Sequence, residues 1–483
     1  MSILMADPKA DETKARMHAL LAAQKAAHLR EGAPSAAKRK DRLNRCISIL
    51  QTHATEIVDA LNADFGNRSK EMSMLTDVAG AIGPLKHARD NLDKWMRSEK
   101  RKVEAPLNLF GAKAEVRFQP KGVVGVISPW NFPVQLTFGP LAGILAAGNR
   151  AMIKPSEYTP ETSALMARLF DLVFDEEEIG VIVGGPEVGA AFAGLAFDHL
   201  IFTGGTSIAY HVMRAAADNL VPLTLELGGK SPVIVSRSAD IKKAAARVMT
   251  GKTMNAGQIC LAPDYTFVPR ESRDAFVQAA SDIVAKMYPT IKDNPDYTAI
   301  INQRHYDRIK GLVEDARAKG AQVLEINPNN EDFTQQEHRR IPPTLILDPT
   351  DDMKVMQEEI FGPVMPIKTY ADVSEAVAYV NANPRPLGLY VFSEDAAETE
   401  RVLETTTSGG VTVNDVIFHV SVEDLPFGGV GPAGMGSYHG RDGFLEFSHK
   451  KAVYTQIKAD LLSMMRPPYG DAFRKQVAAR VKG

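Results

Sequence analysis

Val123-Val124-Gly125-Val126-Ile127 is the first apolar run of residues 122–227, the stretch that decides the fold. Short β-branched or apolar runs in this stretch alternate with helical segments; the runs are residues 123–127, 151–153, 179–183, 199–202 and 223–225. The helical segments include residues 159–174 and 207–217. Buried strands that alternate with helices predict a parallel, doubly wound α/β sheet. Such a sheet binds ligands beyond the carboxyl ends of its strands.

A second alternating block follows, from residue 231 to about residue 414. Its strands are expected near residues 232–235, 345–347 and 390–392, which predicts a second α/β domain. Residues 1–101 are expected to be helical, because apolar residues between 43 and 61 recur at helical spacing. Cys46 lies on that apolar face, and we interpret it as a packing residue.

Two further segments are expected to form a small β arm. Residues 106–120 predict a short pair of strands around Gly111, and residues 450–457 predict one more strand. The last strand could pair with the arm of the same subunit or of a neighbouring one. Residues 459–483 are mixed and basic, and we interpret them as a C-terminal tail.

Composition narrows the classes of partner. The 483 residues carry a formal net charge of −3, which argues against nucleic acid or an anionic membrane as the main partner. Two cysteines cannot form a disulfide framework and suit a reducing compartment. Residues 1–30 lack the apolar core of a secretory signal, and the apolar run at residues 139–148 is too short to span a bilayer. Cytoplasm is the expected location, with no membrane span.

Three residues supply the groups that covalent chemistry on a carbonyl needs. Cys260 follows the polar, glycine-containing stretch 255–259, which favours a turn and an accessible thiolate nucleophile. Glu226 ends an apolar strand, where partial burial would raise its pKa and suit it to activate water. Asn131, in Pro129-Trp130-Asn131-Phe132-Pro133, could donate its side-chain NH₂ to an oxyanion. Taken singly, each has a plainer interpretation: a packed cysteine, an ion-paired glutamate and an Asx turn.

Two other segments favour a dinucleotide. Phe202-Thr203-Gly204-Gly205-Thr206-Ser207-Ile208-Ala209 has the order strand, glycine turn and helix start, although it does not match G-x-G-x-x-G. Lys154-Pro155-Ser156-Glu157 follows a strand, and Lys154 and Glu157 could hydrogen-bond an adenosine ribose. A carboxylate there favours NAD over NADP. On spacing alone, a common glycine turn and a solvated loop pair are the favoured interpretations.

Five motifs together resemble those of the aldehyde dehydrogenase superfamily. They are Phe202-Thr203-Gly204, Glu226-Leu227-Gly228-Gly229-Lys230, Gly257-Gln258-Ile259-Cys260, Glu359-Ile360-Phe361-Gly362-Pro363 and Pro426-Phe427-Gly428-Gly429. They occur in the order of that family and cover residues 122–449. Residues 385–393 and 434–440 resemble its class 3 branch, and within that branch residues 431–436 and 442–444 are most similar to coniferyl aldehyde dehydrogenases.

The resemblance implies a chemistry and a set of site residues. Cys260 would attack the aldehyde carbon, Asn131 would hold the oxyanion, hydride would pass to NAD (NADP being possible), and Glu226 would activate the water that hydrolyses the thioester. The implied cofactor-binding residues are Ser128, Pro129, Trp130, Lys154, Ser156, Glu157, Phe202, Gly204, Gly205, Thr206, Leu227, Gly228, Glu359 and Phe361. The expected substrate-binding residues are Asn131, Gln135, Leu261, Phe418 and His419, with Trp130 at the tunnel mouth. No metal is expected. The phosphate turn departs from the family pattern at Gly205 and Ala209.

The resemblance also implies a domain division. Residues 1–105 and 121–227 would form a Rossmann-like NAD-binding domain, residues 228–425 a catalytic domain, and residues 106–120 and 450–458 an oligomerisation arm, with a tail at 459–483. A homodimer is expected, with a small-molecule aldehyde as substrate. Apolar and aromatic walls would suit phenylpropenyl aldehydes such as coniferyl aldehyde, or fatty and medium-chain aldehydes.

The same residues bear on three other possible functions. An acylating dehydrogenase that uses coenzyme A would not need Glu226. A cysteine esterase or hydrolase would leave Lys154, Glu157 and Glu359 without a role. A binding protein on a retired scaffold would not need intact Cys260, Glu226 and Asn131.

Overall fold

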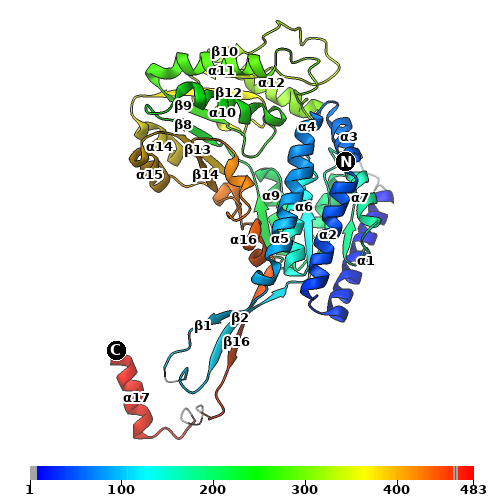
Figure 1. The fold of residues 1–483 in the computed structure, drawn as a ribbon, viewed down its shortest axis with the longest axis vertical. Helices are drawn as coiled ribbons and strands as arrows, with labels where there is room; N and C mark the ends of the chain where they lie inside the picture. The colour runs from blue at the N-terminus through cyan, green and yellow to red at the C-terminus, as the bar shows by residue number, and fades with distance from the viewer. Residues whose placement is uncertain (1–7, 106, 461–462, 464–465, 483) are drawn as a thin grey trace, which may run out of the picture. The chain divides into compact units, whose positions relative to one another are not determined.

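The computed structural model describes residues 8–105, 107–460, 463 and 466–482, which fall into two units (Figure 1). The larger unit takes the described residues of Met1–Trp95 and Pro120–Ser448, and the smaller unit those of Met96–Gln119 and His449–Gly483. Parts of the predicted domains, namely residues 1–7, 106, 461–462, 464–465 and 483, lie outside the described residues. Within the described residues, no helix is long and apolar enough to cross a membrane.

The larger unit begins with helices, as the apolar periodicity predicts. They are α1 (Pro8–Glu31), α2 (Ala36–Thr52), α3 (Ala54–Phe65), α4 (Lys70–Ser73), the π-helical η1 (Met74–Ala79) and α5 (Gly80–Trp95). Ser35 caps α2 by accepting a hydrogen bond from the backbone N–H of Lys38. Cys46 is fully buried on the apolar face of α2, as expected for a packing residue.

The first sheet has the strand order β15-β7-β6-β3-β4-β5. Its strands are β3 (Val123–Ile127), β4 (Arg150–Lys154), β5 (Ile179–Val181), β6 (His199–Thr203), β7 (Leu223–Glu226) and β15 (Gly434–Met435). All its pairings are parallel except that of β15 with β7. From β5 to β7 the order is that of a doubly wound dinucleotide-binding sheet, so the predicted α/β fold is confirmed.

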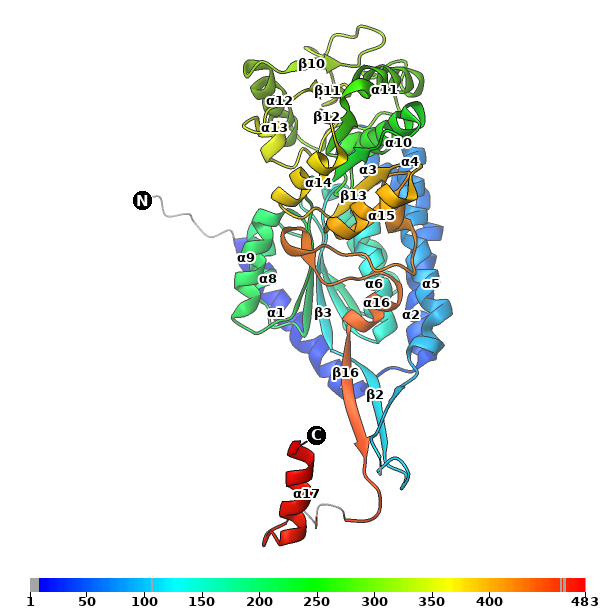
Figure 2. The ribbon, with the colours of Figure 1, turned by 90° about the vertical axis from the view of Figure 1, so that its left-hand side faces the viewer.

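Helices cover both faces of the first sheet (Figure 2). The helices that follow its strands are α6 (Gln135–Ala147), α7 (Pro160–Asp171), α8 (Pro186–Ala193), α9 (Thr206–Ala217) and α16 (Gly440–Glu446). Side chains of α1, α8 and α9 pack on one face with buried strand residues such as Leu200 and Leu225. Helices α2, α5 and α6 lie on the other face.

The second sheet has the order β10-β11-β12-β9-β8-β13-β14 and is parallel except at β10. Its strands are β8 (Pro232–Val235), β9 (Tyr265–Pro269), β10 (Gln322–Glu325), β11 (Thr344–Leu347), β12 (Val364–Tyr370), β13 (Gly388–Phe392) and β14 (Gly410–Val413). Helices α10 (Ile241–Thr253) and α11 (Arg273–Met287) pack on one face. Helices α12 (Gln303–Ala318), α14 (Val373–Ala382) and α15 (Ala396–Thr405) pack on the other. The short helices are η2 (Met254–Gly257), η3 (Arg270–Ser272), α13 (Lys354–Gln357), η4 (Phe418–Ser421) and η5 (Gly431–Ala433).

The smaller unit contains a sheet of order β1-β2-β16 and the helix α17 (Asp471–Lys482). The predicted strand pair within 106–120 is wrong in one respect, because its first strand is β1 (Glu99–Arg101) and only β2 (Lys113–Pro120) lies in that segment. The last predicted strand is β16 (Ser448–Thr455), which pairs with β2 of the same chain. The basic tail forms a helix that was not expected from its sequence.

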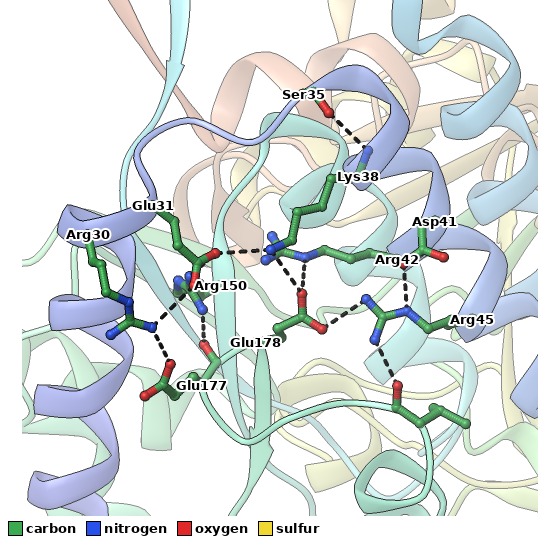
Figure 3. Close-up of polar contacts among 11 residues, drawn as sticks. Arg30, Glu31, Ser35, Lys38, Asp41, Arg42, Arg45, Arg150, Glu177 and Glu178 are labelled. Carbon is green, nitrogen blue, oxygen red and sulfur yellow. Dashed lines mark hydrogen bonds and ion pairs between the residues drawn. The ribbon is translucent and has the colours of Figure 1, made fainter.

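A network of ion pairs joins α1 and α2 to the amino ends of β4 and β5 (Figure 3). Glu178, just before β5, accepts from Arg42 at 3.0 Å and pairs with Arg45 at 2.9 Å. Glu31 of α1 pairs with Arg150, the first residue of β4, at 2.8 Å. We call this end of the first sheet its amino-end edge. The buried Arg42 and Arg150 thus both have carboxylate partners.

Candidate active site

Four strands of the first sheet end side by side at the opposite edge, which we call the carboxyl-end edge. The end of β3 at Ile127 lies between Lys154 of β4 and Phe202 of β6. Thr203 of β6 in turn pairs with Glu226, the last residue of β7. The strand order reverses between β3 and β6, and the crevice beyond such a reversal is where doubly wound sheets bind ligands.

Cys260 lies in a turn after a strained loop. Asn255 and Ala256 have φ of 48° and 51°, and Gly257 has φ of 72°. A Cβ on Gly257 would lie 2.3 Å from the carbonyl oxygen of Gly362, so only glycine permits this approach of the two loops. Backbone strain of this kind is found at functional sites. Cys260 is half-buried in the resulting turn.

Asn131 is hydrogen-bonded to the loop that carries Cys260. Its side-chain Nδ2 donates to the carbonyl oxygen of Gln258 at 3.2 Å. The side chain of Asn255 donates back to the carbonyl oxygen of Asn131, also at 3.2 Å. Two segments more than a hundred residues apart in the sequence are therefore held together, with the Asn131 amide close to the Cys260 turn.

A buried ion pair that sequence reasoning missed supports the Asn131 loop. Arg68 donates to the carbonyl oxygen of Asn131 at 2.8 Å and to Asp77 at 2.6 Å. Asp77 also accepts from the backbone N–H groups of Val134 and Gln135, which lead into α6. Burial lowers the pKa of Arg68 and raises that of Asp77, and each is opposed by the charge of the other. The spacing of Arg68 and Asp77 carries no motif that could have predicted this contact.

Glu226 is a deeply buried carboxyl group. Its side chain is 3% exposed, and neither carboxyl oxygen has a partner in the described part of the chain. Burial raises its pKa well above the ordinary value, and the charge of Glu446 raises it further. Burial likewise raises the pKa of Cys260 to about 12, with added contributions from Glu359 and Glu226. The charge of Glu226 thus contributes to the raised pKa of Cys260.

Glu359 packs against the Glu226-Leu227-Gly228 segment. A Cβ on Gly228 would lie 2.2 Å from Oε1 of Glu359, so this glycine makes room for the carboxyl group. Burial raises the pKa of Glu359 to about 7, although a hydrogen bond from the backbone of Gly229 acts to lower it. Arg308 donates to the carbonyl oxygens of Glu359 and Ile360, at 3.1 and 2.6 Å.

Lys230 and Asp264 hold the same loop from the other side. Lys230 donates to Asp264 and to the carbonyl oxygen of Glu358, and Asp264 accepts from the backbone N–H of Ile360. Lys230 is part of a predicted motif, but its role as a clamp was not expected. The position of Glu359 thus depends on contacts among three chain segments.

The residues predicted to bind a dinucleotide lie along the carboxyl-end edge. Lys154 is buried, and its ammonium donates to the carbonyl oxygen of Pro155 at 2.7 Å and to Glu157 at 3.4 Å. Burial lowers the pKa of Lys154. Glu157 is exposed, and Ser156 is buried and accepts from the N–H of Tyr158. Lys154 and Glu157 are thus a pair at the edge of the interior, not a fully solvated one.

The glycine turn is open. Of the residues that the structure describes, none lies within 4 Å of a Cβ built on Gly205, and none caps with its side chain the helix α9 that starts there. The ring of Phe202 packs beneath Gly204, and Thr206 donates to the carbonyl oxygen of Pro432 at 3.3 Å. An uncapped helix start after two glycines is suited to bind phosphate.

The remaining predicted residues fall into two groups. Near the β3 end, Ser128 accepts from Thr137 at 2.8 Å, Pro129 is half-buried, and the ring of Trp130 meets that of Phe361 at 5.3 Å. Leu227 donates its N–H to Ala433. Of the predicted substrate residues, Gln135 is half-buried at the start of α6, and Leu261 is buried and accepts from Tyr390. His419 pairs with Thr412 at 2.8 Å, whereas Phe418 is 62% exposed.

This geometry defines a doubly wound α/β protein with a half-buried cysteine after a strained loop and an open glycine turn at the end of β6. The model of the "Aldehyde dehydrogenase family" matches residues 4–453. A "probable coniferyl aldehyde dehydrogenase" of Caulobacter vibrioides is 69% identical over 475 residues, 98% of each chain. The "coniferyl aldehyde dehydrogenase" of a Pseudomonas species is 57% identical over 449 residues, 93% of this chain and 92% of that protein. The rat "aldehyde dehydrogenase family 3 member A2" is 39% identical over 432 residues, 89% and 87% of the two chains.

Solved structures of aldehyde dehydrogenases have the same fold as this chain. A substrate-bound AldH of Staphylococcus aureus superimposes with a TM-score of 0.89 at 37% identity, covering 96% of this chain and 99% of its own. An aldehyde dehydrogenase of Mycobacterium tuberculosis in complex with NAD⁺ gives a TM-score of 0.81 at 27% identity, covering 91% and 90%. The chain belongs to the aldehyde dehydrogenase family. It is an NAD(P)-dependent oxidoreductase that acts on aldehydes, and the predicted family resemblance is confirmed.

Proposed function

We propose that Cys260 is the nucleophile of this aldehyde dehydrogenase, Asn131 its oxyanion donor and Glu226 its hydrolytic base. The observation that carries the proposal is the hydrogen bond from Asn131 to the Cys260 loop. Glu226 supports it, because its charge raises the pKa of Cys260 and both its oxygens are unpaired in the part of the chain that is described. The Cys260 sulfur attacks the aldehyde carbon, and the Asn131 amide steadies the charge that develops on oxygen.

Release of the acid is assigned to Glu226. Once the acyl group is on sulfur, Glu226 takes a proton from water as the water oxygen attacks the thioester carbon. The carbon–sulfur bond then breaks, and the acid leaves. A buried carboxylate with a raised pKa is a stronger base than an exposed one, which suits this step.

A dinucleotide fits the carboxyl-end edge, because α9 starts without a side-chain cap beside the open position of Gly205. The nicotinamide, when bound, accepts the two electrons of the oxidation. Lys154, Ser156 and Glu157 would hold the adenosine ribose, residues 204–206 the pyrophosphate, and Glu359 with Phe361 the nicotinamide ribose and ring. The remaining predicted cofactor residues, Ser128, Pro129, Trp130, Phe202, Leu227 and Gly228, would line the site.

The finer choice of cofactor rests on Glu157. Its carboxylate would repel a 2′-phosphate, and we therefore expect a higher kcat/KM with NAD than with NADP. Measured with both cofactors at one aldehyde concentration, a preference for NADP would contradict this assignment.

For the substrate we propose a phenylpropenyl aldehyde such as coniferyl aldehyde. The support is the name and 69% identity of the Caulobacter relative and the 57% identity of the Pseudomonas one. Asn131, Gln135, Leu261, Phe418 and His419 would contact it. A fatty or medium-chain aldehyde is the alternative, and ranking cinnamyl-type, aryl and straight-chain aldehydes by kcat/KM distinguishes the two.

We also propose that the chain has the predicted domain division, forms a homodimer and is located in the cytoplasm. Both cysteines are free thiols, which supports a reducing compartment. The arm would be formed by β2 and β16 of one chain, and sedimentation would test the dimer.

Substitution of the nucleophile tests the proposal. Cys260→Ala should lower NADH formation by about 10⁴-fold or more, since an enzyme that loses its nucleophile keeps only binding and oxyanion effects. Cys46→Ala is the matched control, because it removes the only other thiol of the sequence from a packed helix face and should keep most of the activity. Loss of activity in the Cys46 variant alone would contradict the assignment.

A further inference from the structure

The proposed chemistry does not use the buried polar groups of residues 423–438, a segment whose strand β15 pairs with β7 at Glu226. Besides the two oxygens of Glu226, the hydroxyl of Tyr438 and Oε2 of Glu423 have no hydrogen-bond partner among the described residues. Buried polar groups in native proteins are almost always satisfied, by protein or by ordered water. Groups that lack a protein partner at neighbouring positions are thus suited to hold a chain of water.

Tyr438 is next to Glu226 in the fold. The strand β15, three residues before Tyr438, pairs with β7 so that Gly434 lies opposite Glu226. Tyr438 is 1% exposed, and its ring packs on α6, 3.6 Å from the position of a Cβ on Gly139. Burial raises its pKa, and Glu226, Cys260 and Glu423 raise it further. The hydroxyl is thus neutral, and the charges of all three groups act on it.

Glu423 connects this interior to the surface. Its Oε2 is buried, whereas its Oε1 lies 3.7 Å from the position of a Cβ on Gly83, an exposed residue of α5. Burial raises the pKa of Glu423 to about 7, so its carboxyl group can both take up and release a proton near neutral pH.

The titratable groups around Glu423 come from several elements. They include Tyr438, whose pKa both Glu226 and Glu423 raise, His87 of α5 and the neighbouring Asp424. His419 and His439 both lie against the ring of Phe427 in tilted contacts. His87 lies 3.8 Å from Asp424, whose side chain is 85% exposed. Burial lowers the pKa of His419 to about 4 and that of His439 to about 3, so neither is a cation at neutral pH.

We propose that Tyr438 and Glu423 carry the proton of the deacylation step from Glu226 to solvent. This inference rests on the proposed role of Glu226. The proton that Glu226 takes from the hydrolytic water passes to the Tyr438 oxygen while the Tyr438 hydroxyl proton moves on to Glu423, directly or through water. Glu423 then releases it to bulk solvent, which restores the Glu226 carboxylate and the Tyr438 hydroxyl for the next turnover. No oxidant or further reactant is needed.

Glu423→Gln and Tyr438→Phe test the path, because each keeps the shape of its side chain and removes the group that transfers the proton. In rapid-quench experiments with aldehyde and NAD, both variants should form the first NADH at the wild-type rate. Decay of the acyl-enzyme should then slow by about 100-fold, the usual contribution of a positioned proton donor or acceptor. Adding formate or acetate should restore the decay of the Glu423→Gln variant, which a merely structural defect would not allow.

Asp424→Asn is the matched control, as it removes an exposed carboxylate from the same loop, and its acyl-enzyme should decay at the wild-type rate. Acyl-enzyme decay within twofold of wild type in both Glu423→Gln and Tyr438→Phe would overturn the path, as would a slow decay that small acids do not rescue. Failure of the Glu226 assignment gives a different result, namely normal acyl-enzyme decay in Glu226→Gln.

Discussion

The two edges of the first sheet hold buried charged groups in opposite ways. At the amino-end edge, Glu178 is paired with Arg42 and Arg45, and Glu31 with Arg150. At the carboxyl-end edge, Glu226 is more deeply buried and, among the described residues, has no partner for either oxygen. The same sheet thus uses one edge for stability and keeps reactive groups unpaired at the other.

The pKa values of Glu178 and Glu226 are shifted in opposite directions. Burial raises the pKa of both, but at Glu178 the charges of Arg42 and Arg45 outweigh it and leave the pKa below its ordinary value. At Glu226 the neighbouring Glu446 adds to the effect of burial. Compared with an exposed glutamate, the fold therefore stabilises the charged form of Glu178 and destabilises the charged form of Glu226.

The largest effect is expected from replacing the unpaired Glu226, and it is an effect on catalysis. Glu226→Gln should lower steady-state turnover by about 10²- to 10⁴-fold, because the amide cannot take a proton from water. One equivalent of NADH should still form quickly, since Cys260 and Asn131 are intact. Stopped-flow absorbance measures both phases, and unchanged steady turnover would contradict the assignment of the base.

The next effect is on stability at the amino-end edge. Glu178→Gln should lower the free energy of unfolding by about 3–5 kcal/mol, because it leaves the buried Arg42 without its partner. Glu177→Gln is the matched control: its pair with Arg30 is exposed, and its loss should cost about 0–1 kcal/mol. Urea unfolding gives both values, and equal losses would show that the edge does not depend on burial of the pair.

The smallest expected effect is a gain in stability, opposite to the loss expected at Glu178. At neutral pH, Glu226→Gln should raise the free energy of unfolding by about 1 kcal/mol, as is common when a functional buried charge is removed. Because the folded-state pKa of Glu226 is raised, its contribution to stability is full below the unfolded-state pKa and is lost as pH rises. The advantage of the variant should therefore grow from about pH 5 to about pH 8. An advantage that shrinks over this range would contradict the raised pKa.

Much of the carboxyl-end edge could be predicted, because strand ends are encoded locally. The apolar runs before Ile127, Lys154, Thr203 and Glu226 lie within a few residues of the observed strands. In a parallel sheet such ends meet at one edge, so the pattern of strands alone places residues that are distant in sequence close together. The Asn-Ala-Gly stretch before Cys260 likewise predicts a turn from local residue preferences.

The supporting contacts could not be predicted. Arg68 contacts a carbonyl oxygen 63 residues away, and Lys230 contacts one 128 residues away, and neither distance leaves a pattern in the sequence. Tyr438 lies in a motif that indicated the family but no chemical role for its hydroxyl. The misplaced arm strand β1 consists of Glu99, Lys100 and Arg101, which have no apolar alternation from which a strand could be recognised.

One measurement tests the central claim most directly: mass spectrometry of the Glu226→Gln variant after mixing with NAD and an aldehyde. The account predicts a single added acyl group, which peptide mapping places on Cys260, while Cys46 stays unmodified in the packed interior of α2. An acyl group on any other residue, or NADH formation without any covalent adduct, would contradict it.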